Sequence, residues 1–473
     1  MGEAERSYRD LEEIFRAGLR RADPLELLGS LVRLEENTLL IGPPGTSGSP
    51  AHREPLAFDL LSYERIVVLG AGKASARMAL GLERLLGDRI SGGVVAVKRG
   101  HGEPLQRIRI IEGGHPVPDP SSVAAAQALL QEAEAAGERD LVLLVVSGGG
   151  SAILCLPLED EAAGGPQERG APRLSLSLAD KQQVTRALLG CGATIHEMNC
   201  VRKHLSGIKG GRLAQRLYPA TSVTLLLSDV VGDEPGVIAS GPTVPDESTY
   251  ADALEVIARW ALESSVPEKA LRLLRRGAQG RIPETPKPGD PVFERAHTVL
   301  AGSNLQSILA SARRAAELGY HPLVLTSRLQ GQAREVARLF VALGRDCALS
   351  GIPLEPPACI LAGGETTVTV TGGGKGGRNQ ELALAYLAEL DGRECDGRTF
   401  LLSASSDGSD GPTDSAGAFA SRELALEARK RGLEPRRYLA DNDSYAFFSL
   451  LGGHLKTGPT NTNVCDLQIL IVR

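Results

Sequence analysis

The chain has 473 residues, of which 42% are hydrophobic and 23% are charged, and its formal net charge is −6. This length and composition are typical of a soluble protein with two domains, each built around its own core. The acidic balance excludes a general nucleic-acid binder, and no apolar stretch approaches the length of a membrane span. We therefore expect neither nucleic acid nor a membrane as a partner.

The seven cysteines are odd in number, and no two of them have the C-x-x-C spacing of zinc and redox sites. They fit reduced cysteines better than a disulfide framework. The first residues, MGEAERSYRDLEE, lack the basic and then apolar pattern of a secretory signal. These features predict a cytoplasmic protein. The sequence leaves its oligomeric state open between a monomer and a homodimer.

Short apolar runs alternate with helical patterns along the chain, as in α/β layers around mostly parallel sheets. In the first half we predict strands at 65–70, 93–98, 140–147 and 222–229. Two segments between them, 121–137 and 177–190, have helical patterns. The second of these helices begins with Ser177 and Asp180 at the spacing of a capping box.

A proline-rich stretch, GRIPETPKPGDP at 280–291, interrupts both periodicities and predicts a linker or a long surface crossing. Beyond it we predict strands at 297–302, 321–326, 358–363, 367–372, 399–405 and 466–472. The chain is thus expected to form two Rossmann-like α/β domains, residues 1–285 and 286–473. The charged, glycine-rich residues 159–173 predict a mobile surface loop.

The first of several glycine loops, LGAGKAS, follows the strand at 65–70 and opens a helix. A dinucleotide fingerprint would use Gly70 and Gly72 but needs a third glycine where Ser75 stands. A P-loop would use Lys73 but needs Ser or Thr where Ala74 stands. Neither motif is met, yet the amides of a helix start beside an ammonium group suit a phosphate or a carboxylate.

Two further loops are candidate anion sites. In VVSGGGSAIL, three glycines lie between two serines, and their amides can turn toward an oxyanion. In TVTGGGKGGRNQE, residues 369–381, cationic and polar side chains follow a glycine run at a helix start. We predict that phosphate or substrate is bound by Gly70, Gly72, Ser147, Gly148, Gly149, Gly150, Ser151, Lys375 and Asn379.

Acidic side chains follow two predicted strands, and Mg²⁺ prefers a few such carboxylates together with phosphate oxygens and water. Asp229 lies in LLLSDVVGDEPG, while Asp407 and Asp410 lie in SASSDGSDGPTDSAGAF. We predict that these three residues hold Mg²⁺, although turn formation also explains them. His115 and His204 lie near glycines and are weaker candidates for substrate contact. Lys203, Lys209 and Arg212 make one segment locally basic.

These motifs together resemble one known family. The segments concerned are GAGKAS, VSGGGSAI, HLSGIKGGRLA, LSDVVGDEPGVIASGPTVPD, GGETTVTV, GKGGRNQELAL, SDGSDGPTDSAGAF and TGPTNTNVCDLQILIV. Their order and spacing, from about residue 8 to the end, are similar to those of class II glycerate kinases, the glycerate 2-kinases with a MOFRL domain.

The resemblance implies ATP-dependent phosphorylation of D-glycerate to 2-phosphoglycerate, with Mg²⁺, in an active-site cleft between two α/β domains. It also implies that Lys73 and Arg378 are the catalytic cations. Both residues lie at glycine turns, so we expect their truncation to cost little stability. The alternative is an NAD(P)-dependent hydroxypyruvate reductase, which the missing third glycine and the absence of a ribose-binding acid disfavour.

Overall fold

The computed structural model describes residues 2–42, 54–159, 174–390 and 393–473. Most of the predicted loop 159–173 lies outside these residues. The chain divides into two compact units, each described by itself below. Unit 1 comprises residues 1–26, 229–232 and 302–473, and unit 2 comprises residues 27–228 and 233–301.

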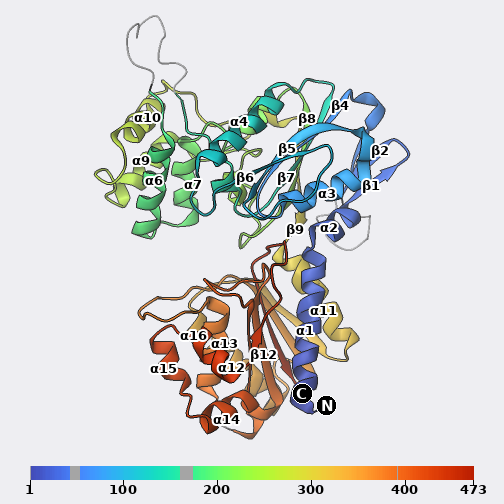
Figure 1. Cartoon of the computed structure of the whole chain (residues 1–473), viewed down its shortest axis with the longest axis vertical. Helices are drawn as coiled ribbons and strands as arrows, with labels where there is room; N and C mark the ends of the chain where they lie inside the picture. The colour runs from blue at the N-terminus through green and yellow to red at the C-terminus, as the bar shows by residue number, and fades with distance from the viewer. Residues whose placement is uncertain (1, 43–53, 160–173, 391–392) are drawn as a thin grey trace, which may run out of the picture. The chain divides into compact units, whose positions relative to one another are not determined.

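Unit 2 is built on a six-stranded sheet in the order β6-β5-β4-β7-β8-β9, in which β6 to β8 run parallel (Figure 1). Its strands are β4 (Arg65–Ala71), β5 (Ile90–Lys98), β6 (Arg109–Gly113), β7 (Asp140–Val146), β8 (Thr221–Leu227) and β9 (Ala296–Gly302). A small antiparallel sheet joins β1 (Val32–Glu35), β2 (Thr38–Ile41) and β3 (Leu56–Asp59). β4 and β7 are continuous apolar runs because they are central and covered on both faces.

The helices of unit 2 include several that begin at a side-chain cap. They are α2 (Pro24–Leu31), α3 (Ser75–Leu86), α4 (Pro120–Glu134), α5 (Gly150–Ile153), α6 (Leu178–Cys191), α7 (Ile195–His204), α8 (Arg212–Leu217), α9 (Tyr250–Arg259) and α10 (Glu268–Ala278). The capping box of Ser177 and Asp180 at α6 is confirmed. Four of them, α6, α7, α9 and α10, enclose a separate apolar cluster around Tyr250 and Leu273.

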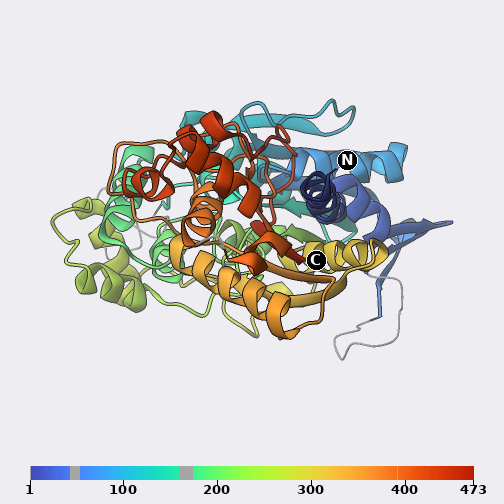
Figure 2. The same cartoon turned by 90° about the horizontal axis from the view of Figure 1, so that it is seen from below.

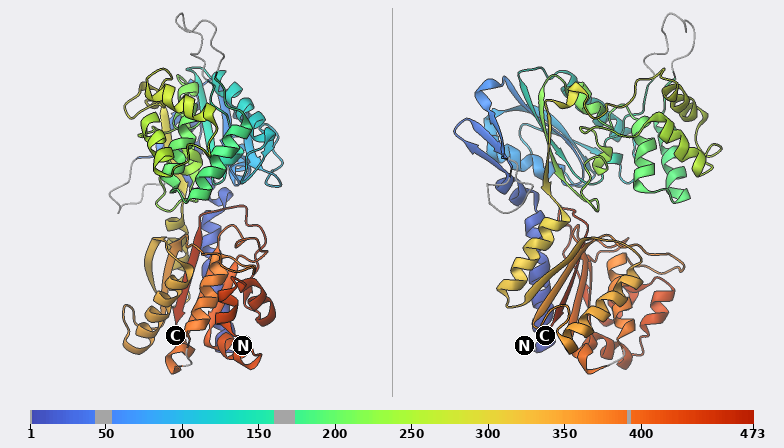
Figure 3. Two further views of the ribbon diagram at one scale, coloured as in Figure 1. Left: turned by 90° about the vertical axis from the view of Figure 1, so that its left-hand side faces the viewer. Right: turned by 180° about the vertical axis from the view of Figure 1, so that it is seen from behind.

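Unit 1 contains a six-stranded mixed sheet in the order β10-β11-β15-β12-β13-β14 (Figure 3). The strands are β10 (His321–Leu329), β11 (Ala358–Gly364), β12 (Thr399–Ser405), β13 (Gly417–Ser421), β14 (His454–Leu455) and β15 (Asp466–Val472). β10 and β11 are parallel, whereas β15 runs antiparallel to both β11 and β12. Two α/β domains are thus confirmed, with the parallel pairing concentrated in unit 2.

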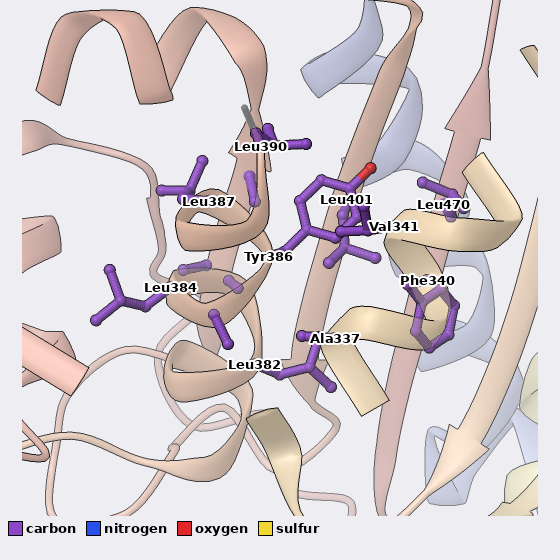
Figure 4. Close-up of a cluster of buried hydrophobic side chains, with 14 of the residues drawn as sticks. Ala337, Phe340, Val341, Leu382, Leu384, Tyr386, Leu387, Leu390, Leu401 and Leu470 are labelled. Carbon is purple, nitrogen blue, oxygen red and sulfur yellow. The ribbon is translucent and has the colours of Figure 1, made fainter. Parts of the chain in front are cut away.

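Helices cover both faces of the unit 1 sheet. They are α1 (Glu3–Ala22), α11 (Asn304–Glu317), α12 (Ala333–Ser350), α13 (Arg378–Glu389), α14 (Arg422–Lys430), α15 (Pro435–Ala440) and α16 (Ser444–Leu451). Figure 4 shows one apolar layer, in which Phe340 of α12 and Tyr386 of α13 lie near Leu401 and Leu470 of the sheet. The opposite layer contains Phe15 of α1, and Figure 2 shows α1 nearly end-on beside α11.

The compact units differ from the predicted domains 1–285 and 286–473 at both ends of the first domain. Helix α1 packs on α11 and on the unit 1 sheet, where Ser311 Oγ donates to Ile14 O at 2.9 Å. The proline-rich stretch 280–291 is fastened to unit 2, since Thr285 Oγ1 donates to Asp246 at 3.0 Å. The boundary between the units therefore lies at the end of β9 and not at the proline-rich stretch, because polar side chains of that stretch hydrogen-bond to unit 2.

One predicted strand, 367–372, is absent from the sheets of the described residues. Thr367 forms only an isolated bridge with Gln332, and Val370 is 73% exposed. The amides of Thr371 and Gly372 donate to Asn442 Oδ1 at 2.8 and 3.0 Å instead of to a neighbouring strand. The prediction of a strand from the alternating pattern is therefore wrong here, because a side-chain acceptor satisfies the backbone amides that a neighbouring strand would bind.

Candidate functional site

In unit 2, the two glycine loops that follow β4 and β7 lie against each other. Lys73 N donates to Gly148 O at 2.9 Å, and Ala74 N donates to Ser147 Oγ at 3.0 Å. A Cβ on Gly72, whose φ is 145°, would lie 2.1 Å from Ser147 Oγ. Gly72 and Ser147 thus brace the two loops, and neither is free for the predicted role in phosphate binding.

Gly70 has a similar structural task, since a Cβ there would lie 2.4 Å from Val145 O on the adjacent strand. Gly150 is also closely packed, against Ala239 and Ala71. The amides of Gly148 and Gly149 are different, because neither has a hydrogen-bond acceptor in the described part of the chain. Two adjacent unpaired amides form a small concavity suited to an anion.

Positive charge gathers around these two amides. Lys73 and His115 flank Gly149, since a Cβ on Gly149 would lie 3.2 Å from Lys73 Cγ and 3.0 Å from His115 Cδ2. Burial, together with the charges of Lys73, Lys98 and His101, lowers the pKa of His115 to about 4. The imidazole is therefore neutral at pH 7, and Lys73 supplies the cationic charge beside the amides. We call Lys73, His115, Gly148 and Gly149 the anion corner.

In unit 1, Arg378 is the first residue of α13 and binds two carboxylates. Its Nε and Nη2 donate to Asp466 at 2.6 and 2.8 Å, and its Nη1 lies 3.0 Å from Glu365 Oε1. Burial alone would lower the pKa of Arg378, but the charges of Asp466 and Glu365 raise it. The guanidinium is thus permanently charged and held in one orientation by a bidentate pair.

The glycine loop before Arg378 binds an anion that the chain itself supplies. Gly373 N donates to Asp441 Oδ1 at 2.9 Å, and Lys375 N donates to Asp443 Oδ1 at 3.0 Å. A Cβ on Gly372 would lie 2.3 Å from Asp441 O. The loop therefore fits closely onto residues 441–443, which explains its glycines without any external phosphate.

Two predicted ligand-binding residues of this loop have other roles. Lys375 is exposed, and its Nζ lies 4.8 Å from the centre of the Tyr445 ring, at cation–π distance. Asn379 is fully buried, and its Oδ1 accepts a 2.6 Å hydrogen bond from Ser403 Oγ. The structure therefore contradicts direct phosphate binding by Asn379 and does not support it for Lys375.

Asp410, a predicted metal ligand, caps α13 instead. Its Oδ1 accepts from Asn379 N at 3.1 Å, and its Oδ2 accepts from Gln380 N at 2.8 Å and Gln380 Nε2 at 3.0 Å. Burial and the charge of Asp466 raise the pKa of Asp410 to about 6, against the opposing effect of these donors. Because both oxygens are occupied and the residue is 1% exposed, Asp410 is a helix cap and not a metal ligand.

Asp407 and Asp229 are the other two residues predicted to hold Mg²⁺. Asp407 Oδ1 accepts from Ser405 and Ser409, while Asp407 Oδ2 has no hydrogen-bond donor among the residues described. Asp229 O accepts from Cys465 Sγ at 3.0 Å, and the Asp229 charge contributes to raising the pKa of that thiol, after burial. Within the described ranges, no group of three or more His, Cys, Asp or Glu could hold a metal by itself.

The remaining histidine and basic candidates have different contacts in the structure. His204 is fully buried and contacts Cys200 O at 2.8 Å and Glu284 Oε2 at 3.2 Å, so it is structural. Lys203 pairs with Asp246 at 3.1 Å. Arg212 donates to Tyr250 Oη at 2.9 Å. Only Lys209 of that basic segment points toward the loop after β7, where it donates to Ser151 O at 2.9 Å.

Sequence reasoning missed Asp466, Glu365, Lys181 and Arg202. Asp466 is the first residue of a strongly apolar strand, and a buried carboxylate at such a position needs a partner, which was the available signal. Nothing in the local pattern distinguishes Lys181 or Arg202 from other helical surface cations. Their burial follows from how α6 and α7 pack in unit 2.

Comparison with known proteins gives the family. The family described as "Domain of unknown function (DUF4147)" matches residues 10–275, and the MOFRL family matches residues 358–466. A D-glycerate 2-kinase of Thermotoga maritima is 41% identical over 414 residues, which cover 87% of this chain and 92% of the relative. The chain belongs to the MOFRL-domain glycerate kinase family. The expected family resemblance is confirmed.

Further relatives agree with this family. The crystal structure of a glycerate kinase from Thermotoga maritima has a TM-score of 0.82 and 36% identity, covering 99% of this chain and 100% of that chain. A glycerate kinase of Homo sapiens is 36% identical over 464 residues, which cover 87% of this chain and 85% of the relative. Relatives from Agrobacterium vitis carry the provisional name hydroxypyruvate reductase. No helix within the described ranges is both long and apolar enough to cross a membrane.

Proposed function

We propose that the protein transfers the γ-phosphoryl group of ATP to the 2-hydroxyl of D-glycerate, forming 2-phosphoglycerate. Membership of the glycerate kinase family supports this activity. The single structural observation that carries the proposal is the anion corner, where Lys73 lies beside the two unpaired amides of Gly148 and Gly149. Phosphoryl transfer depends mainly on positioning and on positive charge around the moving group.

In this reaction Lys73 is a compact charge on phosphate oxygens, and the amides of Gly148 and Gly149 hold the same oxygens. Arg378, the second predicted catalytic cation, is a preoriented guanidinium, and its N–H groups not used by Asp466 and Glu365 are suited to phosphate oxygens. Asp466 and Glu365 are positioning residues, because they hold Arg378 and do not themselves contact substrate. Ser147 positions the loop that carries Lys73.

The residues of unit 1 fit Mg²⁺ better than a soft metal. Asp407 offers one carboxylate oxygen and Asp229 is the second predicted acid, while all seven cysteines are outside disulfides. An ion held by so few protein oxygens is completed by phosphate and water, as Mg²⁺ prefers. When bound, Mg²⁺ neutralises part of the phosphate charge. The unpaired cysteines also support a reducing, cytoplasmic location.

A coupled ATP assay with D-glycerate tests the activity, and analysis of the product distinguishes 2-phosphoglycerate from 3-phosphoglycerate. Formation of 2-phosphoglycerate is expected. Oxidation of NAD(P)H by hydroxypyruvate, without ATP-dependent product, would instead establish the reductase function whose name some relatives carry.

The metal assignment has its own test. Asp407→Asn should raise the Mg²⁺ concentration needed for half-maximal activity by about tenfold, the lower range for altering a metal site. Asp410→Asn is the matched control, because it alters a helix cap in the same loop and should reduce thermal stability without that shift in Mg²⁺ requirement. Equal Mg²⁺ requirements in the wild type and Asp407→Asn would remove Asp407 from the metal site.

A further inference from the structure

Next to the anion corner, unit 2 contains a cavity of about 220 Å³ whose basic residues lie outside the predicted phosphate-binding loops. His115 and Gly149 of the anion corner line it together with Ser151, and Lys181, Arg202 and Lys209 contribute three basic side chains. No aspartate or glutamate is among the described residues that line it. We call this space the cationic cavity.

Two of the three cations are buried and hydrogen-bonded only to carbonyl oxygens. Lys181 is 7% exposed and donates to Leu205 O at 2.9 Å. Lys209 is 2% exposed and donates to Ser151 O at 2.9 Å and Leu154 O at 3.0 Å. An ammonium group has three donors, so each lysine retains at least one for a ligand.

Arg202 is half-buried and has neither a hydrogen bond nor an ion pair with any described residue. Its planar fork of donors is suited to binding a carboxylate with two parallel hydrogen bonds. No carboxylate of the described chain forms a salt bridge with Lys181, Arg202 or Lys209. Three basic groups are thus collected around one space without a counter-ion, and charging all three is unfavourable unless an anion enters.

The electrostatics of Lys209 agree with this picture. Burial, and then the positive charges of Lys181 and Arg202, lower the pKa of Lys209 to about 7, and only the Cys155 thiol acts in the opposite direction. His115, which also faces the cavity, is neutral at pH 7 and contributes no negative charge. A bound anion would therefore favour protonation of Lys209.

We propose that the cationic cavity binds the carboxylate of the 2-hydroxy acid, with Arg202 as its main bidentate partner and Lys181 and Lys209 completing the charge. The inference rests on the proposed function and adds to it the residues that recognise the acid. Since Gly149 belongs to both spaces, a small acid held here places its hydroxyl toward the anion corner. The cavity thereby selects for an acid over a neutral polyol.

The primary test is Arg202→Met, with Arg186→Met as the matched control on the exposed side of α6. Arg202 forms no internal hydrogen bond, so its replacement should leave folding intact. We expect KM for D-glycerate to rise by about 10- to 100-fold, as for loss of a charged hydrogen-bond pair, while KM for ATP is unchanged. The wild-type preference for D-glycerate over its neutral amide, glyceramide, should fall by the same factor.

Calorimetry without ATP provides a second readout. At pH 8, binding of D-glycerate should be accompanied by proton uptake, measured as a dependence of the heat on buffer ionisation enthalpy. Arg202→Met should bind D-glycerate about 10- to 100-fold more weakly, and Arg186→Met should bind as the wild type does. Lys209→Met removes two hydrogen bonds to carbonyl oxygens and tests folding as well as binding, so it is secondary.

The outcomes separate the two proposals. Wild-type KM and wild-type glycerate binding in Arg202→Met would overturn the carboxylate assignment while leaving kinase activity intact. If Arg202→Met lost binding of inorganic phosphate but still bound D-glycerate as the wild type does, the carboxylate assignment would be overturned in favour of a phosphate site. If the wild type binds D-glycerate in an Arg202-dependent manner but forms no phosphorylated product, the carboxylate site stands and the kinase proposal fails.

Discussion

Two glycine runs, 148–150 in unit 2 and 372–377 in unit 1, are similar in sequence but differ in what their amides bind. The amides of the unit 1 loop donate to Asp441, Asn442 and Asp443 of the same chain. In the unit 2 loop, the amides of Gly148 and Gly149 have no acceptor among the described residues. A glycine run is therefore informative about ligands only after its own hydrogen bonds have been accounted for.

The cations beside the two loops differ in the same way. Arg378 is neutralised by Asp466 and Glu365, so its charge is largely used to hold its own orientation. Lys73 forms no ion pair with a described carboxylate. Of these two residues, Lys73 has its charge available to an incoming anion, whereas Arg378 is a rigid guanidinium held by carboxylates.

The largest expected effect separates these two kinds of cation. Arg378→Ala leaves Asp466 buried and unpaired, and should destabilise unit 1 by about 3–5 kcal/mol as well as reduce kcat. This corrects the expectation from sequence that truncation of Arg378 costs little stability. Chemical denaturation followed by circular dichroism measures the loss, and adding Asp466→Asn should restore part of it. An unchanged denaturation midpoint for Arg378→Ala would show that the pair is not a structural one.

Lys73→Ala should behave in the opposite way. Its side chain has no internal partner to lose, so stability should change little, while kcat falls by about 100- to 1000-fold because a preorganised charge is lost from the transition state. Steady-state kinetics with D-glycerate and ATP provide the measurement, and Lys430→Ala is an exposed control. A rise in KM at constant kcat would make Lys73 an anchor for bound substrate.

Asn442→Ala tests the internal ligand of the unit 1 loop. The side chain accepts from the amides of Thr371 and Gly372 and donates to Glu381, so its loss should cost about 1–3 kcal/mol of unfolding free energy. kcat should change far less than in Lys73→Ala. If Asn442→Ala instead lost activity at full stability, the loop would have a direct catalytic role after all.

The smallest expected effect concerns acid stability. Because the pKa of His115 is about 4 in the folded protein, below the 6.5 of a free imidazole, the unfolded state takes up the proton first as pH falls. The neutral imidazole thus contributes stability above pH 6.5 that is lost between pH 6.5 and 4. His115→Gln should reduce this loss of unfolding free energy between pH 6.5 and 4 by about 1 kcal/mol, allowing for solvent screening. Thermal melts at pH 4.5 and 7.5 provide the comparison.

Much of the local structure follows from the sequence alone. Continuous apolar runs identify the central strands β4 and β7, because strands covered on both faces have no polar side to alternate with. Ser177 and Asp180 identify the start of α6, because a capping box is complete within four residues. The ordered motifs were also sufficient to indicate the family and the candidate cation Lys73.

Other features depend on partners that are distant along the chain. Asp410 lies 30 residues from the Gln380 amide that it caps, and Asp466 lies 88 residues from Arg378. The cations of the cationic cavity come from α6, from α7 and from the segment before α8, and only the packing of unit 2 brings them to one space. Local periodicity reports which backbone forms a strand or a helix. Which amide remains unpaired and which charge lacks a counter-ion is decided by tertiary contacts, since these supply or withhold the partner.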